Sequence, residues 1–325
     1  MTDQTIPERL FKYVGFTPRV LQQLCMGEVY YSDPGNFNDP LDCRPTVQTD
    51  LPIPDLQDVL AQLIVRRVSK EVSESMKRLR FKAETIASRQ ELLARKVFET
   101  LVQNIQYEAN HPEVSDAEAH KKFALGNAIE YELRKAYDQG VFCLSIRYDS
   151  PLMWSHYADQ HRGICIEFDV SKLPAGAIRR VRYGDSREVR ASAIQSWLRD
   201  DSVQARQEIE GACLLTKSTE WKYENEYRLL GRAGVQTSIM TFKSITFGLK
   251  CSGALEYAVI AALGGVDSGL SFFRIPPPGS RFELSREEVD VQETLAGMPQ
   301  INILDDFDPI NTEVETSGAP SEEQT

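Results

Sequence analysis

The chain has 325 residues, 42% of them hydrophobic, and a formal net charge of −11. A chain of this length can bury a sizeable core, either as one large domain or as two smaller ones. The acidic charge and a sequence pI near 5.1 disfavour nucleic acid as a partner, and no apolar run reaches the roughly 18 to 20 residues that span a bilayer. The start of the chain lacks the basic and apolar segments of a secretory signal, so we expect a cytoplasmic protein with no membrane contact.

Residues 1–50 predict the first part of the core as a strand, a helix, a second strand and a turn. The first strand is "LFKYVGF" at 10–16. Thr17 and Pro18 have the residue types of a helix cap and a first helical position, and Gly27 is typical of a helix end. "EVYYS" at 28–32 predicts the second strand, and the Pro, Gly, Asn and Asp residues that follow it require a tight turn.

Residues 51–139 differ from the segments around them. Apolar residues recur at helical spacing among dense charge, with a break at His111 and Pro112. We expect a helical insertion of three or more helices.

Strand signals return in residues 140–285. "VFCLSI" and "GICIEFD" are apolar enough to be central strands. The further expected elements are a strand at 177–184, a helix at about 186–217, a strand at 219–231, a strand within 238–250, and a helix or strand at 252–265.

Residues 286–325 contain no Lys or Arg after Arg286 and are rich in acidic and turn-forming residues. This composition is typical of a largely disordered tail. Together the segments predict an α+β fold in which a mixed or antiparallel central sheet carries a large helical insertion and an acidic tail.

The six cysteines stand singly, without a CxxC pair, which favours free thiols.

His156 and His161 are five residues apart, a step of about 140° on a helix, so the two rings do not share a helix face as a four-residue metal motif requires. Hydrogen bonding within a polar loop is the simpler interpretation of this pair.

The segment "WKYENEYR" alternates between charged and aromatic residues. On one strand, Glu224 and Glu226 would share a face with Lys222 and Arg228. The charges could pair with neighbouring strands. Alternatively, the two carboxylates, about 7 Å apart on one strand face, could point into a cleft and hold a sugar hydroxyl or a developing cation.

Four motifs carry a resemblance to a known family. "LFKY", "FNDPLDC", "MWSHYADQHRGICIEF" and "WKYENEYR" resemble, in order, the motifs of a large and mostly bacterial family catalogued as domain of unknown function 2971 (DUF2971). The resemblance extends from Leu10 to about Leu263 and includes the long helical insert. It implies no activity.

A second and more distant resemblance, to the ADP-ribosyltransferase superfamily, implies a chemistry. It gives Lys12 or Tyr13 the first-strand place that binds the nicotinamide ribose, although the superfamily has His or Arg there. It gives Tyr31 and Ser32 the second-strand place beside nicotinamide. Glu226, preceded by Glu224, takes the place of the carboxylate that holds the ribose and stabilises an oxocarbenium-like cation.

Other residues of the motifs complete the expected pocket. His156 joins the two glutamates as a catalytic candidate, and Trp154 is either a base-stacking residue or a core anchor. Phe37 could close the pocket, while Asn38 and Asp39 fix the shape of their loop. The remaining binding candidates are Ser155, Tyr157, His161 and Arg228.

These residues predict a nucleotide-binding enzyme that uses NAD for ADP-ribosyl transfer or glycosidic cleavage in bacterial stress or phage defence, with an unknown macromolecular acceptor. One alternative is a hydrolase or nuclease that holds Mg or Mn through Asp39, Asp42, His156 and Glu226. Another is a non-enzymatic sensor that uses the helical insertion as a partner surface.

Overall fold

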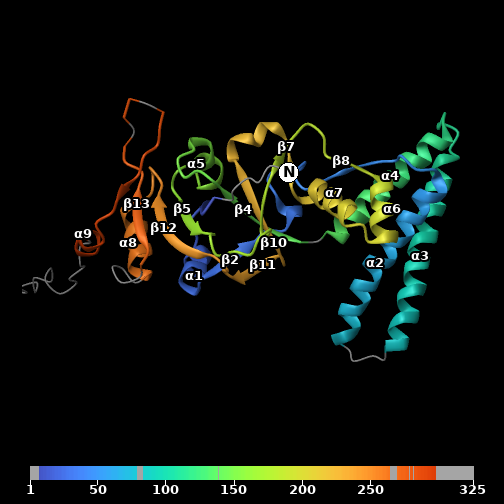
Figure 1. Ribbon diagram of the computed structural model, residues 1–325, viewed down its shortest axis with the longest axis horizontal. Helices are drawn as coiled ribbons and strands as arrows, with labels where there is room; N and C mark the ends of the chain where they lie inside the picture. Colours follow the sequence, from blue (N-terminus) through green and yellow to red (C-terminus); the bar gives the residue numbers. More distant parts are fainter. Residues whose placement is uncertain are drawn as a thin grey trace, which may run out of the picture.

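The computed structural model describes residues 7–78, 83–137, 139–263, 269–277, 279–280 and 282–297 (Figure 1). The helices are α1 (Pro18–Met26), α2 (Ile53–Arg78), α3 (Ala83–Ala109), α4 (Ala117–Ala136), α5 (Pro151–Tyr157), α6 (Ala191–Asp200), α7 (Val203–Leu214), α8 (Gly253–Ala262) and α9 (Val291–Ala296), with 3₁₀ turns η1 (Pro34–Asn36) and η2 (Thr219–Glu224). The strands are β1 (Arg9–Val14), β2 (Glu28–Tyr31), β3 (Thr46–Gln48), β4 (Gly140–Ser145), β5 (Ile164–Asp169), β6 (Ile178–Arg180), β7 (Arg182–Tyr183), β8 (Glu188–Arg190), β9 (Thr216–Lys217), β10 (Glu226–Gly231), β11 (Gly234–Thr237), β12 (Thr241–Phe247), β13 (Ser271–Arg274) and β14 (Glu287–Glu288).

An eight-stranded sheet forms the centre of the fold, in the order β14-β13-β12-β5-β1-β4-β10-β6. Its neighbours pair antiparallel except β12 and β13, which are parallel, so the sheet is mixed. This architecture confirms the predicted α+β class. As predicted, β4 and β5 lie inside the sheet, where strands with two neighbours are apolar along most of their length.

Helix α1 forms as its sequence predicts. Thr17 Oγ1 accepts a hydrogen bond from the Val20 backbone N–H, and Pro18 occupies the first turn. Gly27 ends the helix at φ 66°, a left-handed conformation that glycine adopts without steric cost. The short helix then leads directly into β2.

Strand β2 lies outside the central sheet. It pairs with β11 in a separate two-stranded sheet, and only Ser32, just after it, bridges to Val141 of β4. The unexpected strand β11 supplies the partner that β2 lacks in the main sheet.

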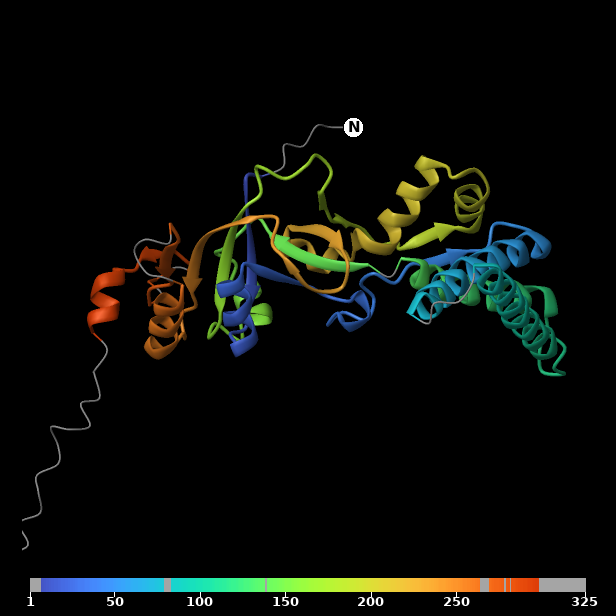
Figure 2. The ribbon, with the colours of Figure 1, turned by 90° about the horizontal axis from the view of Figure 1, so that it is seen from below.

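The helical insertion consists of α2, α3 and α4, with the predicted break near His111 and Pro112. It lies at one end of the elongated molecule, and α8 and α9 lie at the other (Figures 1 and 2). Its apolar side chains share one buried cluster with α6 and α7, including Leu60, Ile129, Ile194 and Ile209. The insertion is therefore packed against the segment that precedes the "WKYENEYR" motif.

Two predicted elements in this region differ from the structure in their secondary structure. The single helix expected at 186–217 is divided into β8, α6, α7 and β9, because Asp201 takes a left-handed conformation and Ser202 caps a new helix. The strand expected at 219–231 begins only at Glu226. Residues 219–224 form η2, whose start is capped by Ser218 and whose end is a left-handed Asn225.

The C-terminal part shows that the segment expected as a helix or a strand at 252–265 contains a helix, and that ordered elements continue past residue 286. Residues 253–262 form helix α8, which Ser252 caps. Residues 287–296 form β14 and α9, so the predicted disordered tail does not begin at 286. The rest of the predicted tail, 298–325, lies outside the described residues.

A small apolar cluster attaches α5 to the central sheet. Trp154 is fully buried, donates its indole N–H to the Tyr148 carbonyl at 2.7 Å, and meets the Tyr13 ring edge-on at a centroid distance of 5.2 Å. This packing fixes α5 over β1 and β5. Among the described residues, no helix has the length and apolar character needed to cross a membrane.

Candidate active site

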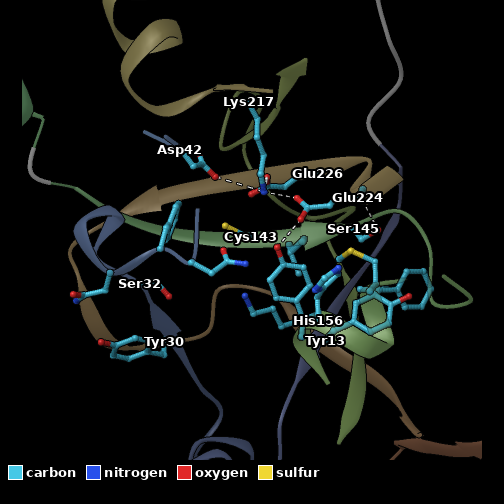
Figure 3. A pocket seen from close by; sticks show the side chains of 18 of the residues that line it. Tyr13, Tyr30, Ser32, Asp42, Cys143, Ser145, His156, Lys217, Glu224 and Glu226 are labelled. Atoms are coloured by element: carbon cyan, nitrogen blue, oxygen red, sulfur yellow. Dashed lines mark hydrogen bonds and ion pairs between the residues drawn. The ribbon is translucent and has the colours of Figure 1, made fainter. Parts of the chain in front are cut away.

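A cavity of about 410 Å³ lies where β1, β4, β9, α5 and the junction of η2 with β10 face the loop after β2 (Figure 3). Its walls combine aromatic and charged side chains. The lining residues are Phe11, Lys12, Tyr13, Tyr30, Ser32, Asp33, Asn36, Phe37, Asn38, Asp42, Cys143, Leu144, Ser145, Met153, His156, Tyr157, Lys217, Glu224 and Glu226.

Lys217 lies at the centre of the charged wall. Its Nζ is 2.5 Å from Glu224 Oε2, 3.3 Å from Glu226 Oε2 and 3.5 Å from Asp42 Oδ2 (Figure 3). Burial alone would lower the pKa of Lys217, but the three carboxylates outweigh it and raise that pKa. The lysine is therefore a fixed ammonium ion rather than a base.

Arg228 binds two of these three carboxylates, those of Glu226 and Asp42. Its Nε donates to Glu226 Oε1 at 2.7 Å, and its Nη2 donates to Glu226 Oε2 at 2.9 Å and to Asp42 Oδ2 at 2.7 Å. Its Nη1 donates to the Leu214 carbonyl at 2.8 Å, and the side chain is fully buried. Glu226 and Arg228 can meet because side chains two residues apart share one face of β10.

The surroundings of Glu226 favour its ionised form. Burial would raise its pKa, but the positive charges of Arg228 and Lys217 are stronger and lower it to about 2. The backbone N–H of Glu226 also donates to the Tyr183 hydroxyl at 2.8 Å, which fixes the start of β10.

The pKa of Glu224 is shifted in the opposite direction, upward. Burial raises its pKa, Lys217 partly offsets this effect, and the neighbouring Glu226 carboxylate adds to it. Tyr157 donates its hydroxyl to Glu224 Oε1 at 2.6 Å, and Ser145 Oγ donates to the Glu224 carbonyl at 2.7 Å. The cavity thus contains two neighbouring carboxylates whose pKa values are pushed apart, a pattern typical of acid–base pairs.

Helix α5 supplies the opposite wall. Ser150 caps it, and Met153, His156 and Tyr157 share its cavity face because residues three and four apart are neighbours on a helix. The His156 ring lies 6.0 Å from Trp221 and 6.4 Å from Tyr223, nearly parallel to the latter. An aromatic group therefore borders the charged wall.

A second cavity, of about 320 Å³, lies next to the first. The two share Lys12, Tyr13, Tyr30, Ser32 and Tyr157 in their walls. Beyond these residues the second cavity is mainly apolar, with Ile166, Phe168 and Phe242. Two neighbouring cavities of this kind suit an elongated ligand with one polar and one less polar end.

The structure brings together more than half of the site residues predicted from sequence. Those that line the first cavity are Lys12, Tyr13, Ser32, Phe37, Asn38, His156, Tyr157, Glu224 and Glu226. This grouping joins residues that are more than 200 positions apart in the sequence.

Six predicted site residues do not line that cavity. Tyr31 packs on Phe142 in the core, and Trp154 is a core anchor. Asp39 accepts a hydrogen bond from the Leu41 backbone N–H and so shapes its own loop. The other three are Ser155 of α5, whose hydroxyl lies 3.4 Å from His161 Nε2, His161 itself, and Arg228 behind the cluster. Tyr31 points away from the cavity because successive side chains of a strand point to opposite sides, and its neighbours Tyr30 and Ser32 point toward the cavity.

Sequence reasoning missed the central lysine. Lys217 lies just before the motif and has no distinguishing pattern in the sequence. Asp42 entered only as a candidate metal ligand. Tyr30, Cys143, Ser145 and Met153 were not assigned to the pocket either, because their positions depend on which strand faces point inward.

The cysteines are free, as predicted. Burial raises the pKa of Cys143, the one that lines the cavity, so it stays a thiol.

The metal alternative needs His156 and Asp39 together, but only His156 lines the cavity. Within the described ranges, no group of three His, Cys, Asp or Glu side chains has a geometry that could hold a metal ion.

The family comparison covers the central part of this site. Residues 153–229 match the family model described as "Protein of unknown function (DUF2971)". The DUF2971 match runs from α5 to β10 and includes His156, Lys217, Glu224, Glu226 and Arg228. It confirms the resemblance in the "MWSHYADQH" and "WKYENEYR" segments. Neither the curated proteins nor the solved structures gave a match.

Proposed function

We propose that this protein binds NAD and cleaves its nicotinamide glycosidic bond, either by hydrolysis or by transfer of ADP-ribose to an acceptor. The observation that carries the proposal is the pair Glu224 and Glu226, held side by side by Lys217 in an aromatic-lined cavity. The distant resemblance to ADP-ribosyltransferases supports the same chemistry.

The charges of the cavity suit a cationic ring. The charged wall has a net charge of −1 when all of its groups are ionised, because the three carboxylates of Asp42, Glu224 and Glu226 outnumber the two cations, Lys217 and Arg228. The oxidised nicotinamide ring is planar and positively charged, so it is attracted both to this wall and to aromatic faces such as Tyr157 and Phe37. Release of the ring as neutral nicotinamide removes that attraction.

The two glutamates would have different roles. Glu226, with its pKa near 2, keeps the negative charge that stabilises an oxocarbenium-like ribose as the bond to nicotinamide breaks. The bonding electron pair goes to the ring nitrogen and neutralises it, so this leaving group needs no proton. Glu224, with its raised pKa, takes the proton of the water or acceptor hydroxyl that forms the new bond to C1′.

The two neighbouring cavities offer space for the rest of the dinucleotide, because five residues line both of them. With the nicotinamide ribose beside the glutamates, Lys12 and Ser32 lie where the two cavities meet and could hold a phosphate or a ribose hydroxyl. Lys12 offers a single point charge rather than the fork of an arginine. The apolar second cavity is then left for the adenosine end.

The test is mass-spectrometric detection of ADP-ribose, or of ADP-ribosylated protein, after incubation of the full-length chain with NAD. We expect products from the wild type and their loss in Glu226→Gln. Glu220→Gln is the matched control, because Glu220 is an exposed glutamate of η2. Absence of NAD binding and products in the wild type, or equal products in wild type and Glu226→Gln, would contradict the proposal. A role in bacterial stress or phage defence and the sensor alternative stay predictions.

A further inference from the structure

A separate cavity of about 270 Å³ lies on the other side of the loop that borders the candidate active site. Its walls come from residues 33–35, 43–44, the end of α4 and the end of α7, and Asp33 is common to both cavities. The lining residues are Asp33, Pro34, Gly35, Cys43, Arg44, Tyr131, Arg134, Lys135, Tyr137, Cys213 and Leu214. This volume is slightly below the range of about 300 to 1,000 Å³ typical of ligand pockets, so a small ligand or one end of a larger ligand fits best.

The cavity is positively charged in a protein that is acidic overall. Among the described residues, the cavity is lined by three cations, Arg44, Arg134 and Lys135, and by one carboxylate, Asp33. That carboxylate is already engaged, since its Oδ1 accepts a hydrogen bond from the Gly35 backbone N–H at 2.7 Å.

Within the described ranges, none of the three cations has an ion-pair partner closer than 4.0 Å. Arg134 Nε is 4.0 Å from Glu130 Oε1, compared with 2.7 Å for the Arg228 pair with Glu226. Lys135 Nζ lies 6.0 Å from the Tyr131 ring centroid. In the part of the chain that the structure describes, no carboxylate lies within ion-pair distance of Arg44 or Lys135.

Two residues that line this cavity each carry a buried polar atom with no hydrogen-bond partner in the described part of the chain. These atoms are the Tyr137 hydroxyl and Arg134 Nε, and Tyr137 is only 7% exposed. Burial raises the pKa of Tyr137, so its hydroxyl keeps the proton and can act as a donor. Buried polar groups are rarely left unsatisfied, so these atoms indicate a missing acceptor.

The position of α4 explains only part of this arrangement. Arg134 and Lys135 lie in its last turn, where positive side chains offset the negative end of the helix dipole. Arg44 belongs to a different segment and has no such role. Its placement beside the helix end brings a third positive charge to one small cavity.

We propose that this cavity binds a phosphate group, with the guanidinium groups of Arg44 and Arg134 as donors and Lys135 as an additional charge. Arginine is suited to this role because its planar fork matches phosphate oxygens. The phosphate could be free or could be the end of a nucleotide. The site is distinct from the proposed NAD site and does not depend on it.

The test is calorimetric titration of the full-length chain with inorganic phosphate at constant ionic strength, and separately with adenosine 5′-monophosphate. We expect saturable phosphate binding in the wild type that weakens about tenfold or more in Arg44→Gln and in Arg134→Gln, as expected when a charged hydrogen bond is lost. Arg89→Gln is the matched control, because Arg89 is exposed on α3. Tighter binding of the monophosphate that is lost in Arg44→Gln identifies a nucleotide end, whereas equal binding identifies free phosphate.

Two results would overturn the proposal. One is a wild type that shows no saturable phosphate binding. The other is phosphate binding that is unchanged in both arginine variants. Circular dichroism identifies a variant that does not fold, and Arg134→Gln and Arg44→Gln alter separate segments, so either one is sufficient for the test.

Discussion

Lys217 Nζ lies 2.5 Å from Glu224 Oε2, and both side chains are almost fully buried. The same nitrogen also lies within 3.5 Å of Asp42 and Glu226, so one ammonium ion neutralises part of a three-carboxylate cluster. The position of the two glutamates relative to the cavity depends on this lysine.

Replacing the lysine will destabilise the protein. Lys217→Met leaves buried carboxylates without their common cation, and we expect the free energy of unfolding to fall by about 3 to 5 kcal/mol. Denaturant unfolding measures the change. Lys222→Met is the control, since Lys222 is exposed on η2. A Lys217→Met variant as stable as this control would show that the cluster does not need the lysine.

Acid will weaken the fold through Glu226. Its folded pKa of about 2 is below the ordinary value of 4.5, so folding favours the ionised form. This contribution is fully present above about pH 4.5 and is lost as the pH falls toward about 2. We expect the stability of the wild type to fall more steeply over this range than that of Glu226→Gln, with Glu220→Gln behaving like the wild type. Equal slopes in wild type and Glu226→Gln would contradict the assigned ion pairs.

The Tyr157 hydroxyl will set the pH dependence of activity. Its hydrogen bond lowers the pKa of Glu224 against the raising effect of burial. Tyr157→Phe removes the bond, so the pKa of Glu224 rises further and the acid limb of NAD cleavage moves to higher pH. The pH–rate profile measures this shift, and Tyr107→Phe, an exposed tyrosine on α3, is the control. An unchanged profile in Tyr157→Phe would remove Glu224 as the base.

Asn225 controls the turn between the two glutamates. It has φ 45°, a left-handed conformation that asparagine and glycine tolerate and β-branched residues do not. We expect Asn225→Gly to keep activity, and Asn225→Val to lose about 1 to 2 kcal/mol of stability together with activity. Thermal unfolding and NAD turnover report both effects. Equal behaviour of the two variants would mean that this turn does not position the site.

The elements that sequence predicted well depend on local chemistry. Helix α1 could be bounded because Thr17 and Gly27 act on their own neighbours. The strand expected at 219–231 was wrong in its first six residues, which form η2, because alternation along six residues does not distinguish a strand from a 3₁₀ turn. Asn225, which forces the change of conformation, carries no strong signal by itself.

In the candidate active site, too, sequence predicted the residues of a local motif and missed the roles that depend on long-range contacts. Glu224 and Glu226 could be proposed from their motif, although the strand face that they were expected to share does not form, because Glu224 ends η2 and Glu226 begins β10. Lys217 could not be proposed, and Asp42 entered only as a metal ligand, because only the packing of β9 and the loop after η1 brings these two residues to β10. Long-range contacts of this kind leave no periodic trace in one sequence.

The rate of nicotinamide release from NAD, measured alongside NAD binding, tests the central claim most directly. We predict that the full-length wild type releases nicotinamide, and that Glu226→Gln binds NAD but releases nicotinamide about 100-fold or more slowly, as expected when a fixed charge that stabilises the transition state is removed. Release at the same rate in both proteins, or no release by a wild type that binds NAD, would contradict the claim.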